Sequence, residues 1–292
     1  VLEGKPGRPA QVLADLERIL EARFTDAQLF HQQDTRTPLE AKVPALEGIV
    51  FHEKLGTVAD RIPRIVRLVE SVGSQLRLPA EFLKKAARAA QLAKADLVTQ
   101  MVREYPSLQG TMGGRYASHD GETPEIAQAI AEQYRPRTAA DPIPSTPLGC
   151  LLGLCDRFDL LLGYFGQGIQ PTGSVDPYGL RRQALGLMRI LLEPPQGLSF
   201  VGLSIDSFFD AGLQSWGSRI SQPEAVRTKL RIFLRERFEW LASVKAQVDP
   251  GLAAAVLASD DDDLAGAWER LQVLHRLWTD SRNGGRILLE KA

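Results

Sequence analysis

The sequence predicts an all-α protein. Apolar residues recur at the three- and four-residue spacing of amphipathic helices in most long segments, and no stretch shows the alternation of a half-buried strand. Glycine and proline gather in a few short stretches between these segments, where they mark turns and connections. The chain has 292 residues, 44% hydrophobic and 24% charged. That is enough for one large domain or two of ordinary size, and we expect a helical chain in two parts.

Three helices are predicted in the first half. The first covers RPAQVLADLERILEARF, residues 8–24, and carries one apolar stripe. The second covers residues 79–105, PAEFLKKAARAAQLAKADLVTQMVREY, whose alanines favour the helix and allow close packing. The third covers TPEIAQAIAEQY, where Thr123 is placed to cap the helix and Pro124 takes the first helical position. The stripe of the first helix comprises Val12, Leu13, Leu16, Ile19 and Leu20.

The second half alternates helices with proline-rich breaks. Four prolines in YRPRTAADPIPSTPLG predict an extended connection, which leads into the strongly apolar PLGCLLGLCDRFDLLLGYF, a buried helix. LRRQALGLMRILLE is the next helix, and EPPQGLSF, residues 193–200, is the candidate domain boundary. Two amphipathic helices follow, in PEAVRTKLRIFLRERFEWLASV and DLAGAWERLQVLHRLWTDS.

The composition of the chain limits the classes of protein to which it can belong. The net charge of −1 gives no global basic field, so contacts with nucleic acid need local groups of arginine and lysine. No apolar run is long enough for a membrane span, and the first residues lack a signal-peptide pattern. Cys150 and Cys155 are expected to be buried thiols, which favours the cytoplasm. The chain does not begin with Met, so we expect a piece of a longer protein.

The pair His119–Asp120, in GTMGGRYASHDGE, raises the question of a metal site. A helical metal hydrolase needs several His and Asp ligands from different helices, and the chain has four histidines, at positions 31, 52, 119 and 275. His31 and His275 are expected at the surface, and His52 in a structural or capping role.

Several phrases resemble the β subunit of bacterial tetrameric glycyl-tRNA synthetase. They are FHEKLGTVADRIPRI, AARAAQLAKADLVTQMVREY, QGTMGGRYASHDGE, AIAEQYRPR and LCDRFDLLLGYFGQGIQPTGSVDPYGLRRQALGLMRI, in the family's order over residues 51–190. FLRERF and AWERLQVLHRLWTDSRNGGRILLEKA resemble the anticodon-binding region of the same family.

The resemblance implies three regions and a function. Residues 1–50 would lead in from an N-terminal body, 51–192 would form an HD-like helical domain, and 193–292 a helical, partial anticodon-binding domain. The chain would position tRNA(Gly) for glycylation at the active site of the α subunit, within an α2β2 heterotetramer. ATP and Mg are used by that α subunit, so no cofactor is expected in this chain.

The resemblance also implies a broken metal site. The His–Asp pair of active HD hydrolases falls on Ala93 and Lys94 here, and neither side chain ligates a cation. Asp156 resembles the last metal aspartate and His119 lies near another ligand position, so we expect a vestigial site near these two and no metal. A metal-dependent HD-type phosphohydrolase acting on nucleotides remains the alternative, and a purely structural docking module is a third.

Candidate RNA contacts follow from the basic residues. Lys94 would replace a metal and attract a phosphate, and would be replaceable with little loss of stability. Arg115 follows the glycine turn GTMGGRY, read as a connection that brings main-chain N–H groups close to a ligand. Arg181 and Arg182 either track RNA phosphates or pair with aspartates inside the fold. Arg227, Arg231 and Arg235 recur every four residues as one positive edge, either a solvated face with local Glu–Arg pairs or an RNA contact, and any of the four tryptophans is a candidate for base stacking. The candidates are Lys94, Arg115, His119, Arg181, Arg182, Arg231, Arg235 and Arg237.

Overall fold

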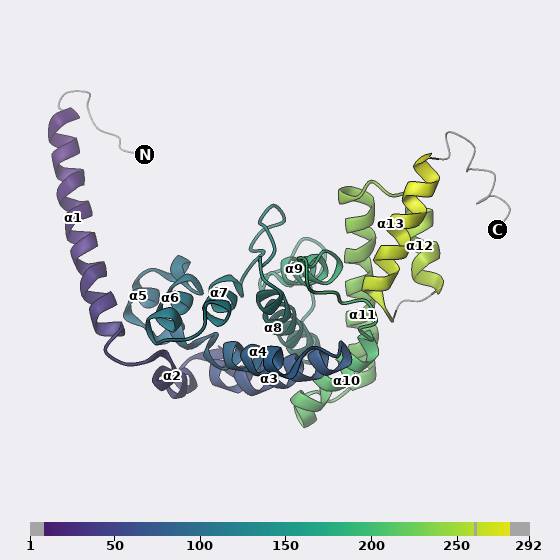
Figure 1. The fold of residues 1–292 in the computed structure, drawn as a ribbon, viewed down its shortest axis with the longest axis horizontal. Helices are drawn as coiled ribbons and strands as arrows, with labels where there is room; N and C mark the ends of the chain where they lie inside the picture. The colour runs from purple at the N-terminus through teal and green to yellow at the C-terminus, as the bar shows by residue number, and fades with distance from the viewer. Residues whose placement is uncertain (1–8, 260–261, 281–292) are drawn as a thin grey trace.

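The structure, a computed structural model, describes residues 9–259 and 262–280, so residues 1–8 and 281–292 of the predicted end regions lie outside it. The all-α prediction is confirmed (Figure 1). The α-helices are α1 (Pro9–Asp34), α2 (Leu39–Lys42), α3 (Val58–Gln75), α4 (Ala80–Leu92), α5 (Gln100–Glu104), α6 (Thr111–His119), α7 (Pro124–Glu132), α8 (Pro147–Gly166), α9 (Leu180–Leu192), α10 (Ile205–Trp216), α11 (Pro223–Trp240), α12 (Pro250–Ser259) and α13 (Leu264–Asp280). No helix in the described ranges is both long and apolar enough to cross a bilayer.

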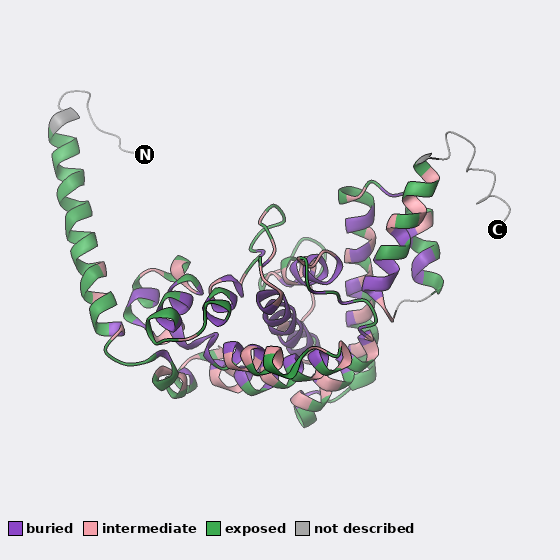
Figure 2. Ribbon diagram, viewed as in Figure 1, coloured by how far each residue is buried: buried purple, intermediate pink, exposed green. Residues whose placement is uncertain are grey.

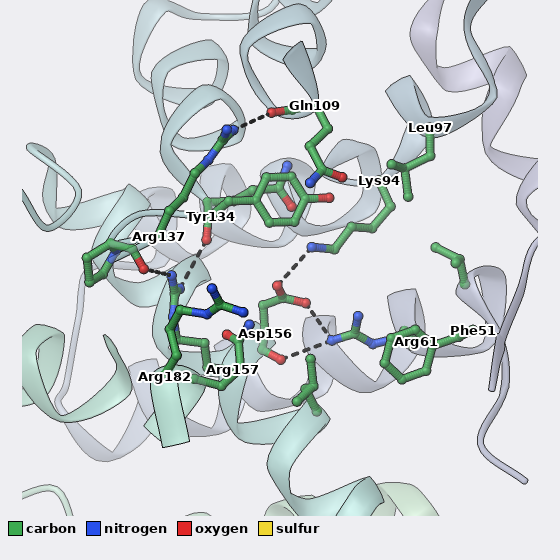
Figure 3. Close-up of a pocket in the computed structure, with 15 residues that line it drawn as sticks. Phe51, Arg61, Lys94, Leu97, Gln109, Tyr134, Arg137, Asp156, Arg157 and Arg182 are labelled. Atoms are coloured by element: carbon green, nitrogen blue, oxygen red, sulfur yellow. Dashed lines mark hydrogen bonds and ion pairs between the residues drawn. The ribbon is translucent and has the colours of Figure 1, made fainter. Parts of the chain in front are cut away.

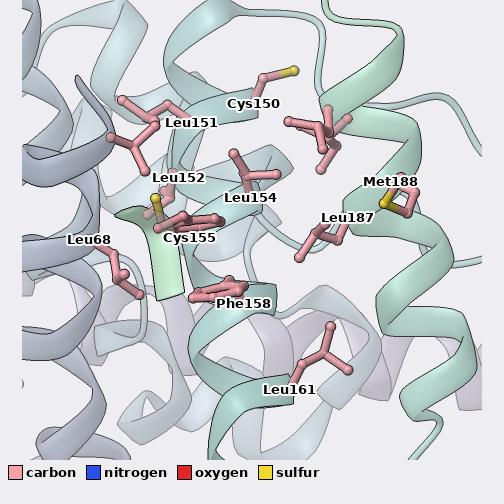
Figure 4. Close-up of a cluster of buried hydrophobic side chains, with 14 of the residues drawn as sticks. Leu68, Cys150, Leu151, Leu152, Leu154, Cys155, Phe158, Leu161, Leu187 and Met188 are labelled. Carbon is pink, nitrogen blue, oxygen red and sulfur yellow. The ribbon is translucent and has the colours of Figure 1, made fainter. Parts of the chain in front are cut away.

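The buried helix α8 is the centre of the fold. Its residues from Leu148 to Phe165 are buried, apart from the partly buried Leu160. Helices α3, α4, α7, α9, α10 and α11 pack around it, and Figure 4 shows leucine, cysteine and methionine side chains filling the space beside α8. Each fully buried leucine contributes about 1.5–3 kcal/mol relative to exposure. The prediction of a buried helix over residues 147–165 is therefore confirmed.

Threonine side chains cap the N-terminal ends of several of these helices. The hydroxyl of Thr123 accepts from the Ile126 N–H at the start of α7, with Pro124 first in the helix, as predicted. Thr146 caps α8 in the same way. Thr57 and Asp60 form a reciprocal capping box at the start of α3.

The single helix predicted over residues 79–105 is wrong. The chain forms α4, then a 3₁₀ turn at Ala95–Val98, then the short α5. The break follows from the buried carboxylate of Asp96, whose Oδ2 accepts the N–H groups of Gly110 and Gly113, at 2.6 and 3.1 Å. Thr99 then caps α5 by accepting from Val102. Polar bonding of this kind outweighs the helical preference of the alanine-rich sequence.

The glycine turn predicted in GTMGGRY is also wrong, because residues 111–119 form helix α6. A Cβ on Gly114 would lie 2.5 Å from the carbonyl oxygen of Ala127, and one on Gly113 would lie 2.9 Å from Ile130. The glycines therefore allow α6 to pack closely against α7. The anion held by the main-chain N–H groups of Gly110 and Gly113 is the protein's own Asp96.

A small antiparallel hairpin joins β1 (Val50–His52) to β2 (Gly56–Thr57), where the sequence predicts no strand. Two strands of three and two residues are too short to show an alternating pattern. The hairpin places Phe51 and His52 against Tyr164 of α8. The structural role predicted for His52 is confirmed, because its Nδ1 also accepts the Lys54 N–H.

Helix α1 projects away from the body of the molecule (Figure 1), and its predicted apolar stripe is exposed along its length (Figure 2). Its C-terminal half is tied down, where Arg23 also pairs with Glu104 of α5 at 3.4 Å. There Asp34 accepts the N–H groups of Gln100 and Met101 at the start of α5, and the hydroxyl of Tyr116 at 2.8 Å.

The helices that follow residue 200 continue the packing of the first part. Helix α10 packs on α3 and α8, and α11 packs on α8 and α9. Phe158 of α8 stacks on Phe208 of α10 with ring centres 3.8 Å apart. The predicted helices at residues 223–244 and 263–281 correspond to α11 and α13, whereas α10 and α12 are not predicted. The domain boundary at 193–200, between α9 and α10, stays a prediction.

Candidate functional site

A buried network of ion pairs joins α8 to α3 and to the end of α4. Asp156 lies between two cations, with Lys94 Nζ 2.8 Å from its Oδ2 and an Arg61 nitrogen 2.7 Å from its Oδ1. Asp159, one turn further along α8, accepts from Arg61 at 3.1 Å and from Arg64 at 2.7 Å. All five side chains are at least nine-tenths buried.

The network keeps Asp156 ionised. Burial disfavours the charge on this carboxyl, but Lys94 and Arg61 outweigh that effect and hold its pKa at about 2. Burial lowers the pKa of Lys94, although Asp156 acts in the opposite direction. Arg61 has a raised pKa, because the attraction of Asp156 and Asp159 exceeds its burial penalty. Asp156 is therefore fully provided with counter-charges from within the chain.

A cavity of about 360 Å³ opens beside Asp156 (Figure 3). The hairpin, α3, the end of α4, the segments around residues 109 and 133–137, α8 and α9 all contribute to its wall. Its lining consists of Phe51, Val58, Arg61, Lys94, Leu97, Gln109, Gln133, Tyr134, Pro136, Arg137, Asp156, Arg157, Leu160, Arg182 and Gln183.

Positive charge dominates this lining, with five basic side chains and one carboxylate. Arg157 donates to main-chain carbonyls, among them those of Gln133 and Gly153, and burial lowers its pKa to about 10. Arg137 donates to the carbonyls of Ser107 and Gln109 and is itself exposed. Neither arginine has an ion-pair partner among the described residues, although Asp156 favours the charge of Arg157 and Arg137 favours that of Asp141. Basic groups therefore outnumber the single carboxylate of the lining.

Two of the predicted RNA contacts, Lys94 and Arg182, line the cavity. Lys94 is only 2% exposed and is bound to Asp156, with its ammonium 4.3 Å from the ring centre of Tyr134. The expectation that Lys94 can be replaced with little loss of stability is therefore wrong, since its removal leaves a buried carboxylate with one partner fewer. Arg182 is exposed and makes no hydrogen bond or ion pair with any described residue.

Arg181 and Arg237 lie together in a separate open hollow of about 320 Å³, with Trp240 and Leu185. Arg181 donates to the Gly173 carbonyl, and Arg237 stacks 3.8 Å over Phe233.

Only one tryptophan stands out as a stacking surface. Trp240 is 44% exposed, whereas Trp216 and Trp268 are buried. Trp278 is partly buried and has a contact of its own.

The predicted arginine edge of α11 is engaged in ion pairs within the fold. Arg231 lies 2.8 Å from Asp206 and Arg235 lies 3.2 Å from Glu239. Arg227, one turn before Arg231, pairs with the same Asp206 at 3.1 Å. The local Glu–Arg pairs expected on this edge are confirmed for Arg235 with Glu239, whereas the partner of Arg227 and Arg231 is Asp206 of α10, distant in the sequence.

Arg115 and His119 lie on α6 and are exposed, and neither lines the cavity. His119 Nδ1 lies 3.3 Å from Asp120 Oδ1, and Asp120 accepts the Leu39 N–H at 2.6 Å. The prediction that His119 lies beside Asp156 in one vestigial site is therefore wrong. The His119–Asp120 pair instead ties the end of α6 to the start of α2.

The residues around Asp156 do not fit a divalent cation. Both carboxylate oxygens already face basic nitrogens, and a metal ion needs several oxygen or nitrogen ligands without such partners. Within residues 9–259 and 262–280, no three His, Cys, Asp or Glu side chains lie together as a ligand set.

Arg61, Arg137, Arg157 and Tyr134 of the site are missing from the sequence-based candidates. The available signal is LCDRFD, because two acids three residues apart on a strongly apolar helix require buried cations from elsewhere in the fold. RIPRI, which carries Arg61 and Arg64 with the same spacing, is the segment that supplies them.

Comparison with known proteins identifies the family. The family described as "Glycyl-tRNA synthetase beta subunit" matches residues 1–258. The chain is 46% identical over 260 residues to the glycine–tRNA ligase beta subunit of Moorella thermoacetica, covering 88% of this chain and 37% of the relative. It is 41% identical over 255 residues to that of Desulforudis audaxviator, covering 87% and 36%. It is 39% identical over 267 residues to that of Trichlorobacter lovleyi, covering 91% and 38%. The chain thus spans little more than a third of the length of these relatives, and it belongs to the glycyl-tRNA synthetase β subunit family.

Proposed function

We propose that this chain binds tRNA(Gly) and positions it for ATP-dependent glycylation at the active site of a partner α subunit. The partnership would be an α2β2 heterotetramer in the cytoplasm, with ATP and Mg used by the α subunit. Family membership supports the proposal, and the observation that carries it is the cavity with five basic side chains and one already neutralised carboxylate.

Such a lining suits a polyanion. Asp156 is satisfied by Lys94 and Arg61, so it does not cancel the charge of the remaining arginines. Arg182 and Arg137 are exposed at the site and present guanidinium groups, which bind phosphate oxygens in a bidentate manner. Binding of this kind releases counterions from the RNA and therefore weakens as salt rises.

Placement is the contribution of this chain to the reaction. Holding the tRNA at fixed points converts a loose encounter between its acceptor end and the α subunit into an oriented one. Orientation lowers the entropic part of the barrier without any group of this chain touching the reacting atoms.

Binding of tRNA(Gly) to the purified chain tests the proposal, measured by fluorescence anisotropy at several salt concentrations. Arg182→Ala is expected to weaken binding about five- to tenfold and to reduce the slope of log K against log salt by about one. Arg67→Ala is the matched control, because Arg67 is exposed on α3, outside the cavity lining.

The proposal fails if Arg182→Ala and Arg115→Ala both bind tRNA(Gly) as the unaltered chain does, with the same salt slope. A chain that binds no tRNA in any of these assays would instead be a docking module. Stoichiometric Mn, Fe, Ni or Zn together with nucleotide turnover would support the phosphohydrolase, which no observation in the described residues favours.

A further inference from the structure

We propose that the cavity beside Asp156 binds one unstacked nucleotide, with its phosphate at Arg182 and Arg137 and its base between Tyr134 and the glutamine amides. The proposal rests on the tRNA-binding function above and makes it specific. The RNA would be recognised through a nucleotide that is unpaired, at a strand end, a loop or a bulge.

A set of polar groups at the cavity has no partner among the described residues. The Arg182 guanidinium, the side-chain amides of Gln109 and Gln183, and the Tyr134 hydroxyl all line the cavity. None of them makes a hydrogen bond or ion pair with another described residue. Polar groups grouped in a cavity without internal partners are available to a ligand.

A buried acceptor lies at the wall of the same cavity. Gln133 is completely buried, and its Nε2 donates to the carbonyls of Ala93 and Ile130. Its Oε1 has no hydrogen-bond partner among the described residues. An acceptor left unpaired in the interior costs about 1–3 kcal/mol. Because this atom is fully covered, a ligand that donates a hydrogen bond at this wall would recover that free energy only if the Gln133 side chain shifts toward the cavity.

The chemistry of these groups specifies the ligand class. Side-chain amides offer a donor and an acceptor side by side, which complements the edge of a nucleobase. Burial raises the pKa of Tyr134 well above its ordinary value, so its hydroxyl is a donor at neutral pH. Phe51, Leu97 and Leu160 provide the apolar wall. Basic, amide and aromatic groups in one cavity match a phosphate joined to a flat, hydrogen-bonding ring.

The size of the cavity sets the number of nucleotides. About 360 Å³ is at the small end of the range for ligand sites, sufficient for one nucleotide and too small for a base pair. A nucleotide must therefore leave its stack to enter, as single-stranded regions of RNA allow at little cost. Since Lys94 and Arg61 bind Asp156 beneath the cavity, the arginines nearer the surface remain to bind the phosphate.

The test separates contacts to the base from contacts to the phosphate. Gln183→Leu and Gln109→Leu remove the amides while keeping side-chain size, and Tyr134→Phe removes the hydroxyl alone. Each is expected to weaken binding of a short single-stranded RNA about fivefold. The salt slope should stay unchanged, whereas Arg182→Ala should lower it. Gln91→Leu, on the exposed face of α4, is the matched control. Thermal melts establish that each variant is folded.

Competition experiments on the unaltered chain identify the source of the nucleotide. Nucleoside 5′-monophosphates are expected to compete with the single-stranded RNA for the cavity. A fully paired RNA duplex, which offers no unpaired nucleotide, should not compete. Competition by mononucleotides without any binding of tRNA(Gly) would keep the cavity chemistry and overturn the proposed function. Loss of tRNA binding in Arg182→Ala, with unchanged binding in the glutamine and tyrosine variants and no competition, would keep the function and overturn this inference.

Discussion

Replacing Lys94 by Met removes the ammonium group beside Asp156 and keeps a side chain of similar length. The pKa of Asp156 is about 2 against an ordinary 3.8. That difference corresponds to about 2 kcal/mol of stability at neutral pH, which is present above about pH 4 and is lost as the pH falls toward 2. Among the groups that lower this pKa, Lys94 acts most strongly, ahead of Arg61 and Arg157.

We therefore expect Lys94→Met to lower the free energy of unfolding by about 1–2 kcal/mol at pH 7. This is less than the 3–5 kcal/mol typical of a buried charge left without any partner, because Arg61 still pairs with Asp156. Urea unfolding between pH 7 and pH 2.5 measures this. The two stability curves should approach each other as the pH falls toward 2, since Asp156 begins to bind a proton in the unaltered chain only near its pKa of about 2. Lys229→Met, an exposed lysine on α11, is the control.

A constant difference between the curves at every pH would refute the reasoning. It would mean that Lys94 stabilises the chain through packing, including its contact with Tyr134, and not through the charge of Asp156. The double variant Lys94→Met with Asp156→Asn sharpens the comparison. If the pair acts through charge, the second substitution should cost less in the Met background than in the unaltered chain.

Three further predictions follow from separate features. Cys150 and Cys155 should not react with a thiol reagent in the folded chain at pH 8, because burial raises the pKa of Cys150 to about 12 and that of Cys155 well above its ordinary value. Rapid labelling before unfolding would contradict this. Gly114→Ala should destabilise the chain by about 1–3 kcal/mol, because the added Cβ would lie 2.5 Å from the Ala127 carbonyl oxygen. An unchanged melting temperature would show that α6 and α7 separate easily. Trp240→Ala should weaken single-stranded RNA binding by about 1–3 kcal/mol, whereas Trp240→Phe should retain most of the affinity. Equal binding by both variants would exclude base stacking at this position.

Helices with a clear apolar pattern or a good cap can be read from the sequence. The run from Leu148 to Phe165 is apolar on all sides and is buried on all sides, and Thr123 with Pro124 marks the start of α7 correctly. The break after Leu92 cannot be read in this way. It depends on Asp96 accepting N–H groups from a segment more than ten residues away. Helical propensity is a local property and does not predict such a contact.

The residues of the site likewise fall into those with a local sequence signal and those without one. Lys94 and Arg182 carry recognisable signals, one by its place in AAQLAKAD and the other by its place at the start of a helix. Arg137 and Tyr134 lie in and beside a proline-rich connection, and only the folded chain shows that they line the same cavity as Asp156. Arg231 and Arg235 form a regular basic edge in the sequence, but Asp206, 25 residues before Arg231, cancels part of it. The position of a counter-charge is tertiary information.

The attachment of α1 at Asp34 has a mechanical consequence. A helix of 26 residues is about 39 Å long, and one carboxylate at its base makes three hydrogen bonds to α5 and α6. Over that length a tilt of about 10° at the base displaces the far tip by about 7 Å. Small rearrangements near Tyr116 are thus magnified at the outer end, and the ion pair of Arg23 with Glu104, at 3.4 Å, is the further contact with α5 that such a tilt has to stretch.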